Sequence, residues 1–333
     1  MVGKYRIQCK TPTLSFDFEI KRQYTEVIGD SGTGKTLFTT AVANKYDTGT
    51  FTFKVTNDVE LLVFTLNDLR KPLEKGVIYV IDEADCSVIF DNSENLRMFH
   101  SIAKYSDCYF ILLCRNILNG VPCSLNEVYE FVHVIEDGTV TAVLSEAYEW
   151  RNEDVVYPTS IVVEDSQLGY RFYRETIKEG INVISSNGNT GITGNLKERL
   201  IYKEKVIFLI ADGAVFAPIY ARLLEYKLLN IDAVDIRLFL KESFEYIILD
   251  SGVVSCNLKY LRQTEDYADT TRFLSWEAFY TDLLVKLMSK TKYRYSKSGN
   301  KFEVLLLEKG NVKKMYQYIR EIDTMAIKDE YIQ

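Results

Sequence analysis

The chain has 333 residues, a length at which one hydrophobic core usually gives way to two domains. Hydrophobic residues make up 47% and charged residues 26%, which excludes a fibrous or disordered class and is typical of a soluble globular protein. A net charge of −7 excludes nucleic-acid binding through an overall positive field, so such binding would need a local basic patch. The N-terminus lacks the apolar stretch of a signal peptide, and no apolar run approaches membrane-spanning length. The six cysteines form no C-x-x-C pair, so we expect free thiols in a cytoplasmic protein without membrane insertion.

Two short strands are expected within residues 4–20, on either side of a turn at Thr11-Pro12. Residues 14–20 alternate apolar and polar side chains, the period-two pattern of a half-buried strand. A β-hairpin that leads into a further strand at residues 24–28 resembles the start of an ABC-type ATPase domain. No LSGGQ-like signature motif follows in this chain.

Residues 29–36 read GDSGTGKT and match the phosphate-binding P-loop pattern G-x-x-x-x-G-K-[ST] at every defined position. The strand expected before the loop and the helix expected at residues 37–45 provide the context that this pattern requires. The glycines let consecutive backbone N–H groups turn toward one centre, and the helix N-terminus adds the positive end of its dipole. Lys35 can reach the β- and γ-phosphates, and the Thr36 hydroxyl can bind Mg²⁺. We therefore expect ATP and Mg²⁺ as cofactors, with the nucleotide bound by Gly29, Asp30, Ser31, Gly32, Thr33, Gly34, Lys35, Thr36 and Leu37.

Residues 76–81 predict a buried strand that runs directly into Asp82 and Glu83. In a parallel sheet, the end of this strand would place both carboxylates beside the P-loop, as in a Walker B arrangement. Asp82 is expected to hold Mg²⁺ through water, and Glu83 is expected to orient and deprotonate the attacking water. Because an acidic pair favours hydrolysis over nucleotide sensing alone, the sequence predicts an ATP hydrolase.

A helix at residues 94–105 and a strand at residues 109–114 are expected next, and the strand ends in Arg115 and Asn116. In P-loop ATPases of the additional-strand class, a polar residue at this strand tip senses the γ-phosphate. That resemblance gives Asn116 or Arg115 a catalytic role, and a plain polar strand cap is the alternative. Arg97 and Arg115 are also candidates for an arginine finger that acts on a neighbouring subunit's nucleotide.

A β-hairpin is predicted at residues 128–145, where Asp137-Gly138 supplies the turn between two alternating strands. His133 lies within this hairpin and is interpreted as a core or edge residue. The polar stretch at residues 146–159 predicts a domain boundary, so the P-loop ATPase domain is expected to span residues 1–148.

The second domain, expected at residues 159–333, repeats a β/α pattern and ends in a helical segment. The expected strands are 161–163, 181–184, 206–211 and 246–249. Three of them lead into Glu164, Asp212 and Asp250. Because the ends of parallel strands lie along one edge of an open sheet, these acids could converge on a divalent cation. The fold class predicted for the whole chain is α/β, with a parallel-sheet core in the ATPase domain.

The run Val163-Glu164-Asp165, the residues that follow it, the Gly188-Asn189 loop and the strand ending at Asp212 resemble the Toprim fold over about residues 160–255. That resemblance implies a Mg²⁺ site for phosphodiester chemistry, formed by a glutamate after the first strand and a D-x-D pair after the third. Glu164 and Asp212 match, but Ala214 occupies the position of the second aspartate. Asp250 or Asp165 could replace it. A Toprim-like domain used only for recognition and an unrelated α/β domain remain as alternatives.

The last segment is expected to be more helical, with one helix at residues 275–287 and another at residues 312–322, and with a strand at residues 302–307. Six basic residues and no acid lie within residues 286–301, interleaved with Tyr293 and Tyr295. Such a segment could bind phosphates and stack bases, or it could be a solvated loop.

An ATPase domain followed by a Toprim-like domain resembles the overcoming-lysogenization-defect nucleases and other ATPase–Toprim anti-phage defence proteins. The resemblance implies that ATP controls a second domain that acts on or recognises DNA or RNA, in a homo-oligomer or with a partner protein. One alternative is an assembly ATPase that resembles the zonula-occludens-toxin type of phage protein. The other is a nucleotide-dependent scaffold or sensor whose second domain is not catalytic.

Overall fold

The computed structural model describes residues 1–46, 50–151, 154–201, 205–229, 234–298 and 300–332. The chain divides into two compact units, Met1–Glu149 with Gln263–Ser275, and Trp150–Arg262 with Trp276–Gln333. The change from the first unit to the second falls within the polar stretch expected to be a boundary. Residues 263–275 differ from the expectation, because they belong to the first unit, where Gly3 N donates to Glu265 O at 2.7 Å and Thr270 Oγ1 donates to Ser106 O at 2.7 Å.

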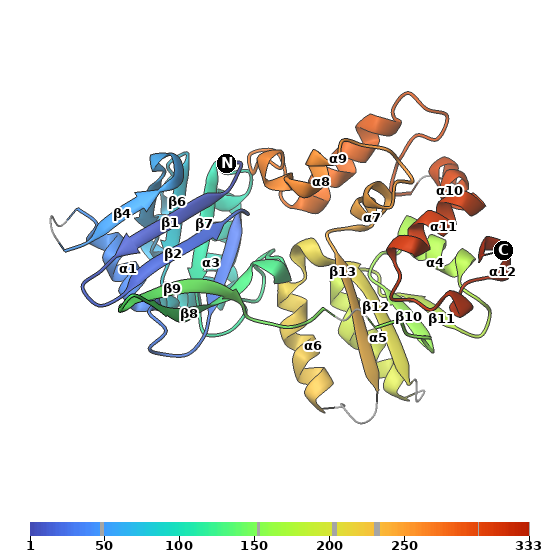
Figure 1. Ribbon diagram of the computed structural model, residues 1–333, viewed down its shortest axis with the longest axis horizontal. Coiled ribbons are helices and arrows are strands. Elements are labelled where there is room, and N and C mark those ends of the chain that lie inside the picture. Colours follow the sequence, from blue (N-terminus) through green and yellow to red (C-terminus); the bar gives the residue numbers. More distant parts are fainter. Residues whose placement is uncertain (47–49, 152–153, 202–204, 230–233, 299, 333) are drawn as a thin grey trace. The chain divides into compact units, whose positions relative to one another are not determined.

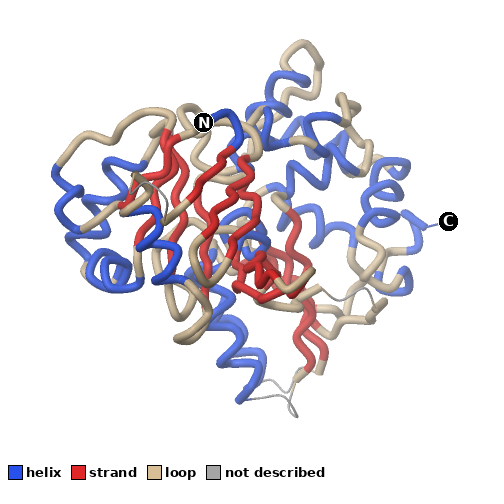
Figure 2. Tube along the Cα trace, turned by 60° about the vertical axis from the view of Figure 1, so that its left-hand side comes forward, coloured by secondary structure: helices blue, strands red, loops and turns tan. Residues whose placement is uncertain are grey.

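The first unit is built on a nine-stranded sheet in the order β4-β1-β2-β9-β8-β3-β7-β6-β5. The five strands from β8 to β5 in this order are parallel, whereas β1 pairs antiparallel with β2 and β4, and β8 pairs antiparallel with β9. Figure 2 shows these strands side by side in red. The strands are β1 Tyr5–Lys10, β2 Ser15–Ile20, β3 Tyr24–Ile28, β4 Thr52–Val55, β5 Glu60–Val63, β6 Val77–Ile81, β7 Cys108–Leu113, β8 Val128–Glu136 and β9 Thr139–Glu146.

Strands β3, β6 and β7 are buried along their whole length, as expected for central strands whose two faces are both covered. Phe38 of helix α1 lies against the sheet, with its ring 5.1 Å from Phe16 and 5.4 Å from Phe18. The helical elements of this unit are α1 Lys35–Ala43, η1 Thr56–Asp58, η2 Leu66–Arg70, α2 Glu83–Phe90, α3 Ser93–Ala103, η3 Leu125–Glu127 and η5 Thr264–Asp266.

The second unit contains a parallel four-stranded sheet in the order β11-β10-β12-β13 (Figure 1). Its strands are β10 Ser160–Val163, β11 Asn182–Ser185, β12 Val206–Asp212 and β13 Asp235–Lys241. The chain leaves β10 to one side for β11 and then crosses to the other side for β12, so the strand order reverses at β10. The helical elements are α4 Leu168–Thr176, α5 Asn189–Ile201, η4 Gly213–Val215, α6 Ala217–Leu229, α7 Phe244–Asp250, α8 Lys259–Arg262, α9 Trp276–Met288, α10 Asn300–Leu306, α11 Lys309–Tyr318, η6 Thr324–Ala326 and α12 Asp329–Ile332.

Two expected strands are wrong, because residues 246–249 lie in helix α7 and residues 302–306 lie in helix α10. The Ser243 side chain caps α7 by accepting a hydrogen bond from Tyr246 N at 3.2 Å. In α10, the buried Phe302 and Leu306 are four positions apart, the spacing of one helix face. Short apolar runs do not distinguish a buried strand from a buried helix, which explains both errors. The fourth strand of the sheet is instead β13, which the sequence analysis missed.

Replacing Phe38 with alanine is expected to lower the free energy of unfolding of the first unit by about 3–5 kcal/mol, because a fully buried ring is lost from the contact between α1 and the sheet. Urea denaturation followed by circular dichroism measures this change. Val88→Ala on α2 is the control, since Val88 is 47% exposed and its loss should change stability by less than about 0.5 kcal/mol. Equal losses in the two variants would contradict the placement of α1.

Candidate functional site

The P-loop connects β3 to α1 through three glycines in the left-handed backbone region. Their φ angles are 129° at Gly29, 90° at Gly32 and 101° at Gly34, a conformation that residues with a Cβ atom rarely adopt. A Cβ atom at Gly34 would also come within 2.9 Å of Leu14 Cδ2. The loop can therefore follow this path only with glycine at Gly34, and helix α1 begins directly after it at Lys35.

The Lys35 side chain is only 5% exposed and lies within the loop. Its ammonium donates to Asp30 O at 3.0 Å, to Thr33 Oγ1 at 3.2 Å and to the Gly29 carbonyl. Thr36 lies in the first turn of α1 and is exposed, and Leu37 is half-buried beside it. The residues of the P-loop that are predicted to bind phosphate thus lie in one short segment, from Gly29 to the first turn of α1.

The predicted acidic pair follows β6, which is separated from β3 by β7. Asp82 is the N-cap residue of α2, and Asp82 Oδ1 accepts a hydrogen bond from Thr39 Oγ1 at 3.2 Å. Because Thr39 lies one turn after Lys35 on α1, this bond connects the end of β6 to the P-loop helix. The structure therefore places the end of β6 within one hydrogen bond of the helix that begins with Lys35 and Thr36. Sequence analysis missed Thr39, which no motif marks.

Glu83 is the first residue of α2, and Glu83 Oε1 lies 2.5 Å from Arg115 Nε. Arg115 follows β7, and its backbone carbonyl accepts a hydrogen bond from Gly29 N at 3.3 Å. Asn116 is exposed next to it, whereas Arg97 donates to Ser93 O at 3.1 Å within α3. Arg115 thus contacts two parts of the candidate site. Its side chain pairs with Glu83, the expected water-activating carboxylate, and its backbone carbonyl binds the start of the P-loop.

Glu26 is a buried carboxyl group on β3 that the sequence analysis did not single out. Its Oε2 accepts a hydrogen bond from Leu118 N at 2.9 Å, which holds the chain after Asn116 against β3. Burial raises the pKa of Glu26 to about 8. His133 was expected to be a core or edge residue of the hairpin, and it is exposed on β8 beyond the residues that pair with β3, where, among the described strands, only β9 lies beside it. Its Nε2 lies 3.3 Å from Thr33 O of the P-loop.

A second group of acidic side chains lies in the second unit, where the strand order reverses. Glu164 follows β10 and Asp212 ends β12, so both lie at the carboxyl edge of the sheet. Glu164 Oε2 accepts a hydrogen bond from Asp212 N at 2.8 Å. Open α/β sheets bind ligands in the crevice at such a reversal point. Two of the three predicted acids are therefore brought together at a place that suits a ligand.

The third predicted acid, Asp250, does not belong to this group. It ends helix α7 rather than a strand, and its Oδ1 lies 2.9 Å from Arg262 Nη2. Asp165, the other candidate, accepts hydrogen bonds from Gln167 N at 2.8 Å and Gly169 N at 2.6 Å, and so caps the start of α4. The buried Ala214 contributes no carboxylate.

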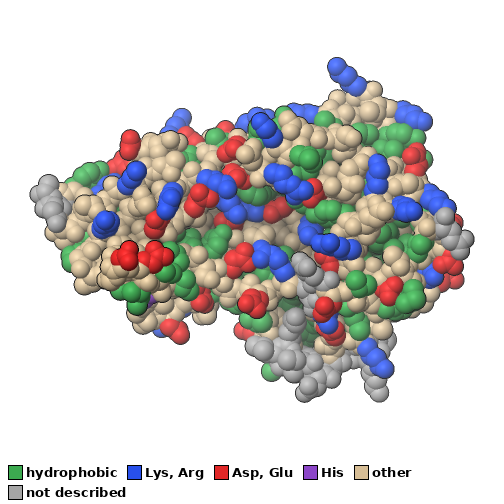
Figure 3. Space-filling view, in the orientation of Figure 1, with side chains coloured by type: hydrophobic (Ala, Val, Ile, Leu, Met, Phe, Trp, Pro, Cys, Tyr) green, Lys and Arg blue, Asp and Glu red, His purple; other side chains and the backbone are tan. Residues whose placement is uncertain are grey.

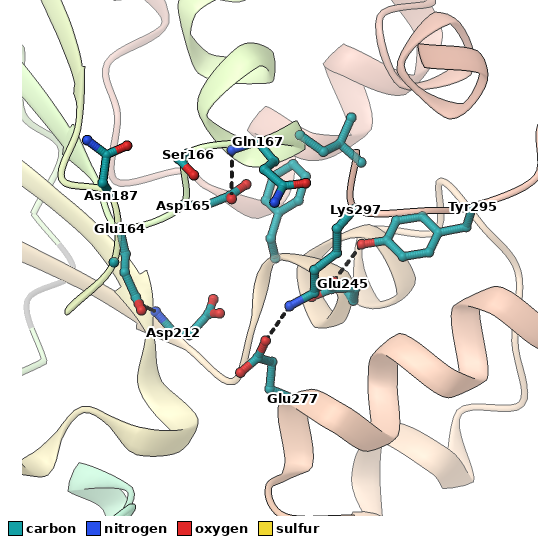
Figure 4. A pocket seen from close by; sticks show the side chains of 13 residues that line it. Glu164, Asp165, Ser166, Gln167, Asn187, Asp212, Glu245, Glu277, Tyr295 and Lys297 are labelled. Carbon is teal, nitrogen blue, oxygen red and sulfur yellow. Dashed lines mark hydrogen bonds and ion pairs between the residues drawn. The ribbon is translucent and has the colours of Figure 1, made fainter. Parts of the chain in front are cut away.

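The acids at the carboxyl edge line a pocket of about 280 Å³ (Figure 4). Helices α7 and α9 contribute Glu245 and Glu277, and the segment between α9 and α10 contributes Tyr295 and Lys297. The Tyr295 hydroxyl donates to Glu245 Oε1 at 2.5 Å. Lys297 Nζ lies 2.5 Å from Glu277 Oε1 and 3.9 Å from Glu245 Oε1. Sequence analysis missed these four lining residues as a group, and only the basic segment that contains Lys297 gave a signal.

Burial in this pocket raises the pKa of Glu164 to about 7. It also raises the pKa of Asp212 well above its usual range, and the nearby carboxylates of Glu164 and Glu277 raise it further. The pKa of Lys297 is raised although burial opposes this, because the carboxylates of Glu245 and Glu277 favour its charged form. The pocket thus gathers several carboxyl groups, of which Glu164 and Asp212 resist ionisation, together with the ammonium group of Lys297.

The pocket does not fit the metal site expected from Glu164, Asp212 and Asp250. Within the part of the chain that the structure describes, no group of three or more His, Cys, Asp or Glu side chains is arranged to hold a metal ion. The ammonium of Lys297 instead pairs with Glu277 in this pocket (Figure 4), whereas Asp250 pairs with Arg262.

Comparison with known proteins identifies no relative. No protein-family model, curated protein or solved structure matches this chain. None of the helices formed by the described residues combines the length and the apolar character that crossing a bilayer requires.

Replacing Glu164 with glutamine is expected to reduce the pH dependence of stability. Because the pKa of Glu164 is about 7 in the folded protein, above the usual value of 4.5, the wild-type protein loses stability as the pH rises from about 4.5 to 7. Thermal unfolding at pH 5 and pH 8 should show a smaller loss of Tm in Glu164→Gln than in the wild type. Glu179→Gln, at an exposed position of the same unit, should keep the wild-type loss. A Glu164→Gln protein with the wild-type pH dependence would contradict the burial of this carboxyl group.

Proposed function

We propose that this chain binds ATP with Mg²⁺ and hydrolyses the nucleotide in its first unit. The hydrogen bond from Thr39 to Asp82 is the observation that carries the proposal, because it joins the P-loop helix to the acidic end of β6. A P-loop sequence alone requires only a turn, whereas this contact supports a common site for Lys35 and Asp82. The position of β7 between β3 and β6 supports the resemblance to P-loop ATPases of the additional-strand class.

Each residue then has a defined task. The backbone N–H groups of the loop and the N-terminus of α1 bind the phosphates, and Lys35 places its positive charge beside them. Thr36 and Asp82 would hold Mg²⁺, which supplies charge neutralisation for the phosphates. Glu83 orients the attacking water and accepts its proton.

The ion pair between Arg115 and Glu83 must open for Glu83 to receive a water. This costs little, since Arg115 is 63% exposed and exposed ion pairs contribute roughly 0.2–1 kcal/mol. Arg115 then lies beside the P-loop with its guanidinium released. It is available to contact the γ-phosphate of its own subunit or, in a homo-oligomeric ATPase, that of a neighbouring subunit.

Replacing Lys35 with alanine is expected to weaken ATP binding by about 10- to 100-fold, the magnitude of one lost charge-assisted hydrogen bond to a phosphate. Titration with a fluorescent ATP analogue measures the affinity. Lys54→Ala removes an exposed lysine of β4 in the same unit and should leave the affinity unchanged. Equal affinities in Lys35→Ala and Lys54→Ala would overturn the nucleotide site.

Replacing Glu83 with glutamine is expected to preserve ATP binding and to lower the hydrolysis rate by about 10²- to 10⁴-fold, because glutamine cannot accept the proton of the attacking water. Phosphate release under saturating ATP measures the rate. Asp91→Asn, at an exposed position at the end of α2, is the matched control. Full turnover in Glu83→Gln would refute the role of Glu83.

We further propose that the second unit acts on or recognises nucleic acid under the control of the ATPase. The pocket at the strand reversal supports a ligand there, and the Toprim resemblance suggests a phosphodiester. Incubation of labelled DNA and RNA with Mg²⁺ or Mn²⁺ separates the two roles. Cleavage that is lost in Glu164→Ala and Asp212→Ala would support a nuclease, whereas binding without cleavage would support recognition.

The two alternative hypotheses, an assembly ATPase and a nucleotide-dependent scaffold or sensor, predict different results. An assembly ATPase would be stimulated by a partner or DNA, and Glu164 and Asp212 would be dispensable. A scaffold or sensor would form oligomers in an ATP-dependent manner, and the oligomers would persist in Glu83→Gln.

A further inference from the structure

Basic charge in the second unit is concentrated in the segment that joins α9 to α10. Residues 283–302 contain six basic residues and no acid, in a chain whose net charge is −7. Lys286 pairs with Asp282 at 2.6 Å, and Lys297 pairs with Glu277. The remaining basic side chains at the centre of the segment are exposed, and they belong to Lys290, Lys292 and Arg294. In Figure 3, blue side chains extend from the upper right of the visible face, where Figure 1 places the chain after α9.

Residues 290–297, which we call the basic strap, are held in place at their C-terminal end. Tyr295 is only 7% exposed, its hydroxyl donates to Glu245, and its ring lies 5.0 Å from that of Phe302. Tyr293 carries Lys292 over its ring at 4.6 Å, and its hydroxyl donates to Glu308 at 3.3 Å. These contacts fix the backbone while leaving the positive side chains in solvent.

The basic strap ends inside the acidic pocket. Tyr295 and Lys297 line the same cavity as Glu164 and Asp212 (Figure 4). Lys297, the last residue of the strap, supplies a positive group at this pocket, where its ammonium pairs with Glu277. One segment therefore carries exposed positive side chains at residues 290–294 and a positive side chain, Lys297, in the pocket at the strand reversal.

We propose that the basic strap is the docking surface for the sugar–phosphate backbone of a nucleic acid and that it directs the bound strand toward the pocket. This inference rests on the proposed nucleic-acid role of the second unit and names the surface that performs it. Phosphates bind Lys290, Lys292 and Arg294 independently of base sequence, because these side chains pair with the phosphate charge and do not contact base edges. A phosphate that reaches Lys297 competes with Glu277 for the ammonium.

The test compares two triple variants of the full chain that each remove two lysines and one arginine. Lys290→Ala, Lys292→Ala and Arg294→Ala remove the exposed charges of the strap. Lys309→Ala, Lys313→Ala and Arg320→Ala remove the same number of exposed charges from the α11 region of the same unit. Fluorescence anisotropy with a labelled 20-nucleotide DNA, single-stranded and duplex, gives the affinity between 50 and 200 mM salt.

The plot of the logarithm of the association constant against the logarithm of the salt concentration has a negative slope. In the strap variant its magnitude is expected to decrease by about 2–3, since each lost phosphate contact removes about 0.7–0.9. The control variant should keep the wild-type slope, and circular dichroism and ATP hydrolysis should be unchanged in both. Equal slopes in the two variants, with DNA binding retained, would refute the strap alone. A wild-type chain that binds neither DNA in this assay, nor the labelled RNA of the cleavage assay, would refute the strap together with the nucleic-acid role. Its ATP hydrolysis would still test the first unit separately.

Discussion

Parallel pairing of β3 with β7 and of β7 with β6 is the constraint on which the candidate ATP site depends. Parallel strands present their carboxyl ends along one edge, so residues far apart in sequence meet there. The P-loop follows β3, Arg115 follows β7, and Asp82 with Glu83 follows β6. A shift in the register of any of these strands would turn buried side chains toward the wrong face of the sheet. Since both faces of all three strands are buried, such a shift would exchange the side chains that pack on each face and disrupt the packing of both.

The same constraint operates in the second unit with a different chemical result. There, β10 and β12 bring Glu164 and Asp212 together, but burial raises the pKa of both, so that ionising them together is costly. The unit compensates with Lys297, whose ammonium pairs with Glu277 near these acids. A side chain of the protein itself therefore offsets part of the charge of the pocket, and a ligand that recruits this ammonium changes that charge.

Most strands and helices were predicted correctly because the sequence patterns that mark them depend only on neighbouring residues. The glycines of the P-loop, the alternation in the first hairpin and the apolar runs of β6, β7 and β12 each reflect the backbone conformation of nearby residues. The errors fell where that signal is ambiguous. Residues 246–249 and 302–306 are short apolar runs, and only their packing and the Ser243 cap make them helical.

The sequence by itself determined that the chain contains a loop with the P-loop pattern and an acidic pair directly after an apolar strand, because those motifs are contiguous. It also identified Glu164 and Asp212, since an acid directly after an apolar strand is visible in one dimension. Only the tertiary structure decided that Thr39 bonds Asp82, that Arg115 holds Glu83, and that Asp250 pairs with Arg262 outside the pocket. Likewise, Glu245, Glu277, Tyr295 and Lys297 come from two helices and a connecting segment, so their convergence depends on how those elements pack rather than on their spacing along the chain.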